Sequence, residues 1–144
     1  MSGNRVILLV IGAALVAASI LAYTMGRPQE ELPRGQIEEY CHITLPPNVF
    51  DLHSLRYRGL LFVRFECENE ALSQWQRTLP GWEDGLRPRG MELELERGWW
   101  KPDELTDVSG RQVSGVSLMA GRVDGNRVVC YLFGDSGEML PSDR

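Results

Sequence analysis

Clustered positive charge is the first thing that this sequence lacks. It has one lysine, Lys101, and a formal net charge of −5. Residues 1–35 hold three arginines and two glutamates, which leaves −6 for residues 36–144. Proteins that bind nucleic acid hold the phosphates with clustered cations. The acidic balance therefore argues against nucleic acid as a partner.

Metal-binding and redox motifs are also missing. The three cysteines, Cys41, Cys67 and Cys130, include no C-x-x-C pair, so neither a zinc ribbon nor a thioredoxin-like motif is indicated, and no cofactor is expected. In an oxidising compartment, the simplest arrangement is a disulfide between two of the three and one leftover thiol. A Cys67–Cys130 bridge requires their strands to be neighbours, and the sequence does not choose among the three pairings. In the cytosol all three would be buried, reduced thiols.

A catalytic constellation is absent as well. Residues 134–137, GDSG, resemble the nucleophile motif of trypsin-like serine proteases over four residues. Those enzymes also need a histidine and a second aspartate, but His42 and His53 lie in an irregular stretch without matching flanks. Glycine, aspartate and serine are also favoured in turns, so we predict a turn at these residues and no catalytic role for Ser136.

One long hydrophobic run is present, at the N-terminus. Val6–Tyr23 reads VILLVIGAALVAASILAY without a charge, and Arg5 precedes it. Extended to Met25, the run has about 20 residues and measures about 30 Å as a helix, which matches a bilayer core. We interpret residues 1–25 as an uncleaved transmembrane signal anchor, because the apolar part of a signal peptide is usually shorter, about 7–15 residues. A cleaved signal peptide and a buried core helix are the alternatives.

The orientation of the anchor and the start of the domain are less strongly marked. Arg5 precedes the run, and Arg27 and Arg34 follow it, so the positive-inside rule hardly discriminates. A short head before a large domain favours a cytoplasmic N-terminus at the plasma (inner) membrane, with the domain in the periplasm or outside the cell. Residues 26–36, GRPQEELPRGQ, predict a linker without its own core, and residues 37–144 a single domain.

Alternation of apolar and polar residues predicts the strands. Residues 61–68 place an apolar row on one face and Arg64 and Glu66 on the other, as in a half-buried strand. The dipeptide Asp124-Gly125 is a hairpin signal. Upstream, residues 41–57 hold an extended segment broken by prolines. The predicted strands cover residues 61–68, 91–96, 113–123 and 126–133, with a short last one at 138–140.

One helix is predicted after the first of these strands. Asn69 is a good N-cap, and Glu70 suits the positive start of a helix. Pro80-Gly81 ends it. One stripe of this helix is apolar and belongs to the core: Leu72, Trp75 and Leu79. The chain is therefore predicted to be α+β, with an antiparallel sheet of about five strands and one packed helix in two layers. No internal repeat is visible.

Two features raise the question of function. Glu92, Glu94 and Glu96 would lie about 6.6–7 Å apart along a strand, near the carboxylate spacing of some glycosidases, but we interpret them as a solvated face. In Glu96–Leu105, ERGWWKPDEL, strand parity places Trp99 in the core and Trp100 on the outer face, unless Gly98 marks a bulge. Burying one indole stabilises by at most about 4–6 kcal/mol, so at least one is expected in the core.

Tryptophan and arginine anchor protein interfaces, so the candidate binding site consists of Trp82, Arg97, Trp99 and Trp100. We expect a membrane-anchored, non-enzymatic, extracytoplasmic domain that binds a protein partner. The alternatives are an inhibitor or immunity protein against a toxin or hydrolase, a small envelope hydrolase, and an assembly subunit of an envelope complex. A deep pocket that joins His42 or His53 to two acidic residues would favour the hydrolase, and a closed surface there would not.

Overall fold

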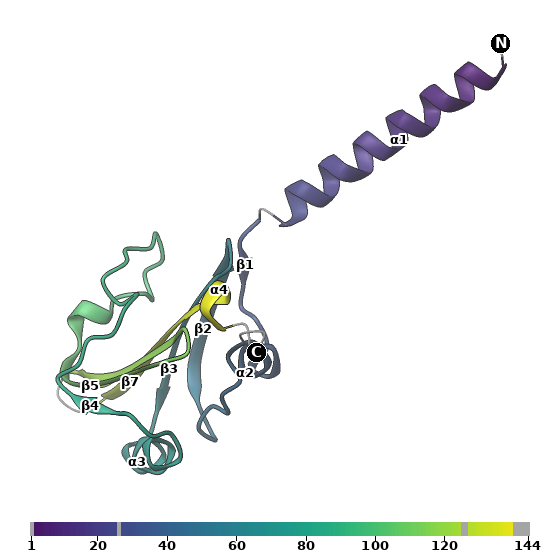
Figure 1. The fold of residues 1–144 in the computed structure, drawn as a ribbon. Helices are drawn as coiled ribbons and strands as arrows, with labels where there is room; N and C mark the ends of the chain where they lie inside the picture. The colour runs from purple at the N-terminus through teal and green to yellow at the C-terminus, as the bar shows by residue number, and fades with distance from the viewer. Residues whose placement is uncertain (1, 26, 125–126, 140–144) are drawn as a thin grey trace.

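The chain consists of an N-terminal helix and an antiparallel sheet with further helices, as the computed structural model shows (Figure 1). The structure describes the backbone of residues 2–25, 27–124 and 127–139. The first helix, α1 (Ser2–Met25), contains an apolar stretch, residues 3–20, that is long enough to cross a membrane, and none of it is buried. A core helix is therefore the wrong interpretation of this segment, whereas a membrane anchor and a signal sequence both fit.

Seven strands form one sheet in the order β1-β2-β3-β7-β6-β5-β4, and every neighbouring pair is antiparallel. The expected number of about five was too low. The strands are β1 (Gln29–Glu30), β2 (Phe50–Tyr57), β3 (Leu60–Cys67), β4 (Glu83–Asp84), β5 (Thr106–Val113), β6 (Val116–Val123) and β7 (Arg127–Asp135). The other helices are α2 (Arg34–Cys41), α3 (Asn69–Thr78), α4 (Ser136–Met139) and the 3-10 helix η1 (Pro102–Glu104).

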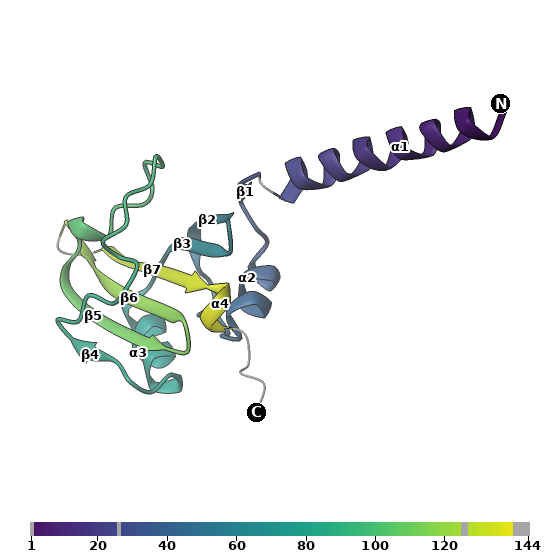
Figure 2. The same cartoon turned by 45° about the horizontal axis from the view of Figure 1, so that its top comes forward.

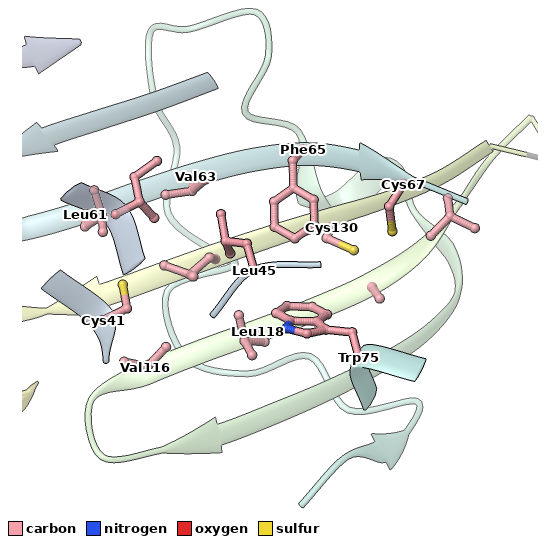
Figure 3. Packing of buried hydrophobic residues seen from close by; sticks show 14 residues of the cluster. Cys41, Leu45, Leu61, Val63, Phe65, Cys67, Trp75, Val116, Leu118 and Cys130 are labelled. Carbon is pink, nitrogen blue, oxygen red and sulfur yellow. The ribbon is translucent and has the colours of Figure 1, made fainter. Parts of the chain in front are cut away.

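One face of the central strands packs against side chains of α2 and α3 (Figure 3). Ile37 from α2 and Trp75 from α3 join the apolar row of β3 in a single buried cluster. The Trp75 ring meets Phe65 edge-on, with 5.7 Å between centroids, and its indole N–H donates to the Thr44 carbonyl at 2.7 Å. The predicted core position of Trp75 is confirmed.

The opposite face of the sheet is covered by the long segment between β4 and β5. Met91 and Trp100 from this segment are buried against Phe62, Tyr131 and Phe133. As a result β3 is buried on both faces, and Arg64 and Glu66 are buried too. The prediction of a half-buried strand was wrong because sequence alternation does not reveal that a loop will cover the polar face.

Residues 91–96 belong to this covering segment and form turns and coil, so the strand predicted there was wrong. The Leu93 amide donates to the Gly90 carbonyl at 3.2 Å, and the Leu93 carbonyl accepts the Trp100 indole N–H at 2.9 Å. These bonds fold the segment back on itself, and no strand in the described part of the chain pairs with it. Met91 and Leu95 therefore pack against the sheet from a loop, whereas Leu93 is exposed.

Other element boundaries also differ from expectation. Asn69 is the first residue of α3 and Glu68 holds the cap position; the Asn69 side chain accepts a hydrogen bond from Arg122 at 2.8 Å. Residues 106–112, not expected to be extended, form most of β5, and a turn at Ser114-Gly115 divides the strand predicted over 113–123. Residues 134–139 finish β7 and form α4, replacing the expected turn and last strand. Gly125 and Leu140 lie outside the described residues.

The segment predicted as a linker contributes to the sheet. Gln29 pairs with Arg56 and Glu30 with Leu55, and Leu32 packs against the helix-side core. The sheet thus begins four residues after Met25, the last residue of α1. Four extended residues span at most about 14 Å, so the β1 edge stays close to the end of α1.

Two hairpins, β2–β3 and β5–β6, repeat the same backbone on either side of β7. Their turns are Arg58-Gly59 and Ser114-Gly115. The first residue of each turn has a φ of 52° or 53°, and the glycine has a φ of 77° in both. The first strand of each hairpin also carries a register shift near its start. When Arg58 of the first hairpin is matched to Ser114 of the second, Val63 corresponds to Met119. These two residues belong to apolar clusters on opposite faces of the sheet. The hairpins are therefore related by a rotation about β7.

Candidate functional site

The four residues of the predicted binding site do not form one surface. Trp82 packs against the cluster on the helix side and meets Trp75 edge-on at 5.7 Å. Trp99 and Trp100 belong to the cluster on the opposite face. A single partner surface that includes Trp82 and the Trp99–Trp100 pair is therefore incompatible with the fold.

The two adjacent tryptophans have the reverse of their predicted roles. Trp100 is only 4% exposed, and its ring contacts Phe62 and Tyr131 edge-on with centroid distances of 5.0 and 5.2 Å. Trp99 is half-buried and stacks on the His53 ring, with 5.7 Å between centroids and 12° between planes. Strand parity gave the wrong answer because residues 96–100 form a turn.

Arg97 and Trp82 are also engaged within the fold. Arg97 forms an ion pair with Glu30 of β1, which ties the covering segment to the edge of the sheet. The Trp82 indole nitrogen is buried and has no hydrogen-bond partner among the described residues. None of the four side chains is therefore a large exposed anchor for a partner.

A charged cluster lies beneath the stacked His53 and Trp99. The buried Arg64 contacts Asp51 and also Glu66 at 3.3 Å, and Glu66 accepts from Arg127 at 2.5 Å. The two His53 ring nitrogens lie 3.0 and 3.3 Å from carboxylates of Asp51 and Glu31. These contacts join β2, β3, β7 and the residue after β1, so we assign the cluster a structural role.

The pKa values in this cluster follow its pairing. Burial raises the pKa of Asp51, but hydrogen bonds with Glu66, His53 and Arg64 and the charge of Arg64 outweigh it, so the pKa lies below its ordinary value. Burial lowers the pKa of Arg64, but the contacts with Tyr131, Glu66 and Asp51 raise it overall. Burial raises the pKa of Tyr131, despite a hydrogen bond from the Lys101 amide. The charged forms of Asp51 and Arg64 stabilise one another.

His42 lies in a hollow of about 650 Å³ between β1, β2 and α2. Its described lining consists of Gln29, Gln36, Glu39, Tyr40, His42, Arg56 and Ser136. This lining holds one carboxylate, whereas the hydrolase alternative called for a pocket that joins His42 or His53 to two. His53 contacts two carboxylates, of Asp51 and Glu31, but it does not line this hollow. Among the described residues, no group of three or more His, Cys, Asp and Glu side chains is arranged to hold a metal ion.

An apolar groove of about 510 Å³ lies between α3 and the segment Ile43–Pro47. One wall is the extended segment, which follows the left-handed residue His42 at the end of α2, and the other wall is one side of α3. Trp75 lies between the walls, where its bond to the Thr44 carbonyl fixes their separation. The described lining consists of His42, Ile43, Thr44, Leu45, Pro46, Pro47, Ala71, Gln74, Trp75, Thr78 and Leu79.

The groove continues into smaller hollows at both ends, which differ in charge. A hollow of about 160 Å³ shares Pro47, Ala71 and Gln74 with the groove and is also lined by Glu68 and Glu70. Neither glutamate forms an ion pair with a described residue. At the other end, a hollow of about 240 Å³ includes Arg111, whose guanidinium donates to the Pro80 carbonyl at 2.6 Å and whose pKa is lowered by burial. The accessible charge of the groove is therefore negative and lies at the start of α3.

Sequence reasoning missed this groove. Its two sides come from residues 42–47 and 71–79, which meet only in the folded chain. The sequence signals were separate from each other: the pair Pro46-Pro47 in one segment, and a later helix with a narrow apolar stripe.

The fold makes one of the three possible cysteine pairings more favourable. β3 and β7 are neighbours, and because Phe65 pairs with Cys130, Cys67 lies diagonally across from Cys130. Figure 3 shows these two sulfur atoms near one end of the cluster and Cys41 near the other. All three are free thiols in the structure. If a disulfide forms, we therefore expect it between Cys67 and Cys130.

Comparison with known proteins adds no functional evidence: no protein family matches the sequence, and neither the curated proteins nor the solved structures show significant similarity to it.

Proposed function

We propose that this chain is a membrane-tethered, non-enzymatic protein-binding domain on the extracytoplasmic side of the plasma membrane, and that the groove along α3 is its docking site. The anchor is α1, whose apolar stretch is long enough to span a bilayer. In both views of the molecule, α3 lies on the side of the domain away from α1 (Figures 1 and 2). This placement leaves the groove accessible to a partner while α1 is in the membrane.

The observation that carries the proposal is the combination of an apolar groove with an acidic end. Ile43, Pro47 and Leu79 provide an accessible apolar surface, and Glu68 and Glu70 lie where the groove reaches the start of α3. A fitting partner is a polypeptide segment with apolar side chains in the groove and a lysine or arginine beside the two glutamates. Complementary charge would speed association and select such a segment over acidic ones.

Gln74 is the most useful position for a test, because it is exposed and lines both the groove and its acidic end. We expect a photo-crosslinking residue at position 74, in the full-length protein in native membranes, to capture one protein. In a separate tagged chain without the crosslinking residue, Gln74→Arg should lower the amount of that protein that co-purifies, and Gln74→Glu should raise it. The same three changes at Ser73, which is exposed on α3 but outside the groove, provide the control for net charge.

The docking proposal fails if positions 73 and 74 capture the same proteins equally, or if Gln74→Arg and Gln74→Glu change the capture in the same direction. The location of the domain needs a separate test. We expect an alkaline phosphatase fused after Arg144 to be active in a bacterial host, because this enzyme matures outside the cytoplasm. An inactive alkaline phosphatase fusion, together with a fluorescent fusion of green fluorescent protein at the same position, would place the domain in the cytoplasm and contradict the proposed orientation.

A further inference from the structure

The hollow of about 650 Å³ lies on the side of the domain where α1 joins the sheet. Its walls come from β1, β2, α2 and the first residue of α4, and Figures 1 and 2 show α2, α4 and β1 gathered near this junction. Gln29, one of its lining residues, is four positions after the end of α1. The connection spans at most about 14 Å, so the hollow opens close to the lipid headgroups when α1 spans the membrane.

The hollow presents one cation and one anion that are not paired with each other. Arg56 is opposite Gln29 in the sheet, and its guanidinium lies over the Tyr40 ring, 4.4 Å from the centroid. Glu39 is exposed on α2 beside Tyr40. Neither Arg56 nor Glu39 forms an ion pair with any residue that the structure describes. Both charges are therefore available to a ligand, and the stacking on Tyr40 restricts the orientation of the guanidinium.

Neutral groups line the space around these charges. Gln29 and Gln36 offer amide donors and acceptors, and Ser136 offers a hydroxyl group. A volume of about 650 Å³ falls within the range of about 300–1,000 Å³ that is usual for small-molecule sites. The site therefore suits a ligand that carries a negative and a positive group, with further oxygen atoms between them.

We propose that this hollow binds the headgroup of a phospholipid that carries both a phosphate and a primary ammonium, as phosphatidylethanolamine does. Arg56 would donate charge-assisted hydrogen bonds to the phosphate, and Glu39 would accept hydrogen bonds from the ammonium. An anionic headgroup fits less well, because residues 36–144 carry a net charge of −6. The proposal depends on α1 being in the membrane and is independent of the groove on α3.

The affinity needed for such a site is low. Its lining residues are largely exposed, so each ion pair with a headgroup would contribute little by itself. Tethering, however, holds the hollow beside the bilayer, where headgroups have a high effective concentration. A weak site can then be occupied and can orient the domain relative to the membrane.

The test uses the full-length protein in nanodiscs that contain equal amounts of phosphatidylethanolamine and phosphatidylcholine with the same acyl chains. Lipids that stay bound after release are counted by native mass spectrometry. We expect phosphatidylethanolamine to be retained in preference to phosphatidylcholine, whose quaternary ammonium donates no N–H hydrogen bond. Glu39→Gln should lower this preference by about threefold, the effect of losing one exposed ion pair. Arg56→Gln should lower the retention of both lipids by a similar factor, because both carry the phosphate.

Arg77→Gln is the matched control, because Arg77 is exposed on α3 and lines neither the hollow nor the groove. This variant should keep the preference of the original chain. Melting curves for all three variants exclude unfolding as the cause of any loss. Equal retention of the two lipids by the original chain, unchanged retention of both lipids in Arg56→Gln, or an unchanged preference in Glu39→Gln would overturn the proposal.

Two further arms distinguish the source of the headgroup. Retention of phosphatidylglycerol above phosphatidylethanolamine would indicate an ordinary anionic-lipid contact and would reject the ammonium site. Phosphoethanolamine, added free in solution, should displace retained phosphatidylethanolamine only at concentrations well above those of the lipid. If free phosphoethanolamine binds in detergent and no lipid is retained from nanodiscs, the ligand is a soluble zwitterion and the membrane role is wrong. Capture of a protein at Gln74 is unaffected by any of these outcomes.

Discussion

Asp51 and Asp107 occupy the same position in the two hairpins on either side of β7, and both have a φ of 51°. Each follows the first residue of its strand, next to the point where the register shifts. Their surroundings differ: Asp51 contacts Arg64 and His53, whereas Asp107 forms no ion pair with a described residue. Asp107 therefore has the backbone of Asp51 without its charge partners.

This relationship gives a prediction about acid stability, tested with Asp51→Asn. Asparagine tolerates positive φ, so the substitution removes the charge and largely preserves the backbone. The folded pKa of Asp51 is lowered, so its charge stabilises the fold above the unfolded value of 3.8, and this contribution is lost as the pH falls through the lower folded pKa. The Asp51 side chain is 47% exposed, so we expect a loss of about 1 kcal/mol or less at pH 6.

The measurement is thermal unfolding of the full-length protein in detergent over a range of pH. The difference between the original chain and Asp51→Asn should be largest at pH 6 and should shrink below pH 3.8. Asp107→Asn should show no comparable dependence on pH. If the two variants lose stability in parallel at every pH, the backbone position matters and the ion pairs of Asp51 do not.

The adjacent tryptophans predict unequal effects of substitution. Trp100→Ala removes a buried indole with three edge-on ring contacts and a hydrogen bond to the Leu93 carbonyl. We expect it to lower the free energy of unfolding by about 3–5 kcal/mol. Trp99→Ala should cost less than half as much, because Trp99 is half-buried and its main ring contact is His53. Denaturant unfolding measures both, and a larger loss for Trp99→Ala would support the strand parity that the structure contradicts.

Gly90 and Gly98, both in the segment between β4 and β5 that covers the sheet face opposite the helices, predict unequal effects of substitution by alanine. Gly90 has a φ of 95°, and a Cβ there would lie 2.2 Å from the Phe133 ring, whereas a Cβ on Gly98 meets nothing within 4 Å. We expect Gly90→Ala to destabilise by about 2 kcal/mol or more, through backbone strain and overpacking. Gly98→Ala should be nearly neutral. Equal melting temperatures of the two variants would show that the segment is not seated on β7.

How much of this fold the sequence reveals depends on whether a pattern is local. The apolar run of α1, the core position of Trp75 and the extended residues 61–67 were predicted, because each is a periodicity within one element. The failures depend on partners distant in sequence. Met91, Leu93 and Leu95 alternate as in a strand, yet no strand among the described residues pairs with them, and the Trp100 indole instead donates to the Leu93 carbonyl.

The repeated hairpins were missed for a related reason. Rotation about β7 places corresponding residues on opposite faces of the sheet, so Val63 and Met119 face different layers. Similar apolar patterns then meet different neighbours, and what remains in common is the backbone, with glycine at Gly59 and Gly115 and aspartate at the positive-φ bulges. The candidate groove and hollow are missed as well, because segments that are far apart in sequence form them.

The cysteines give a last prediction, which concerns their order of reaction with an alkylating reagent. Burial raises the pKa of Cys41 to about 12, whereas a hydrogen bond with Cys130 lowers the pKa of Cys67 although burial opposes it. The same hydrogen bond, together with burial, raises the pKa of Cys130. Thiolates are the reactive species, so we expect Cys67 to react first with iodoacetamide at pH 8, slowly because it is 3% exposed.

Peptide mapping by mass spectrometry at a series of reaction times measures this order in the reduced, folded protein. Cys130→Ala removes the hydrogen bond and should slow Cys67, because a thiolate at Cys67 then loses its donor. Cys41→Ala, a change at the other end of the same cluster, should leave the rate of Cys67 unchanged if the variant stays folded (Figure 3). Faster labelling of Cys41 than of Cys67 in the folded protein would contradict the raised pKa of Cys41 and the lowered pKa of Cys67.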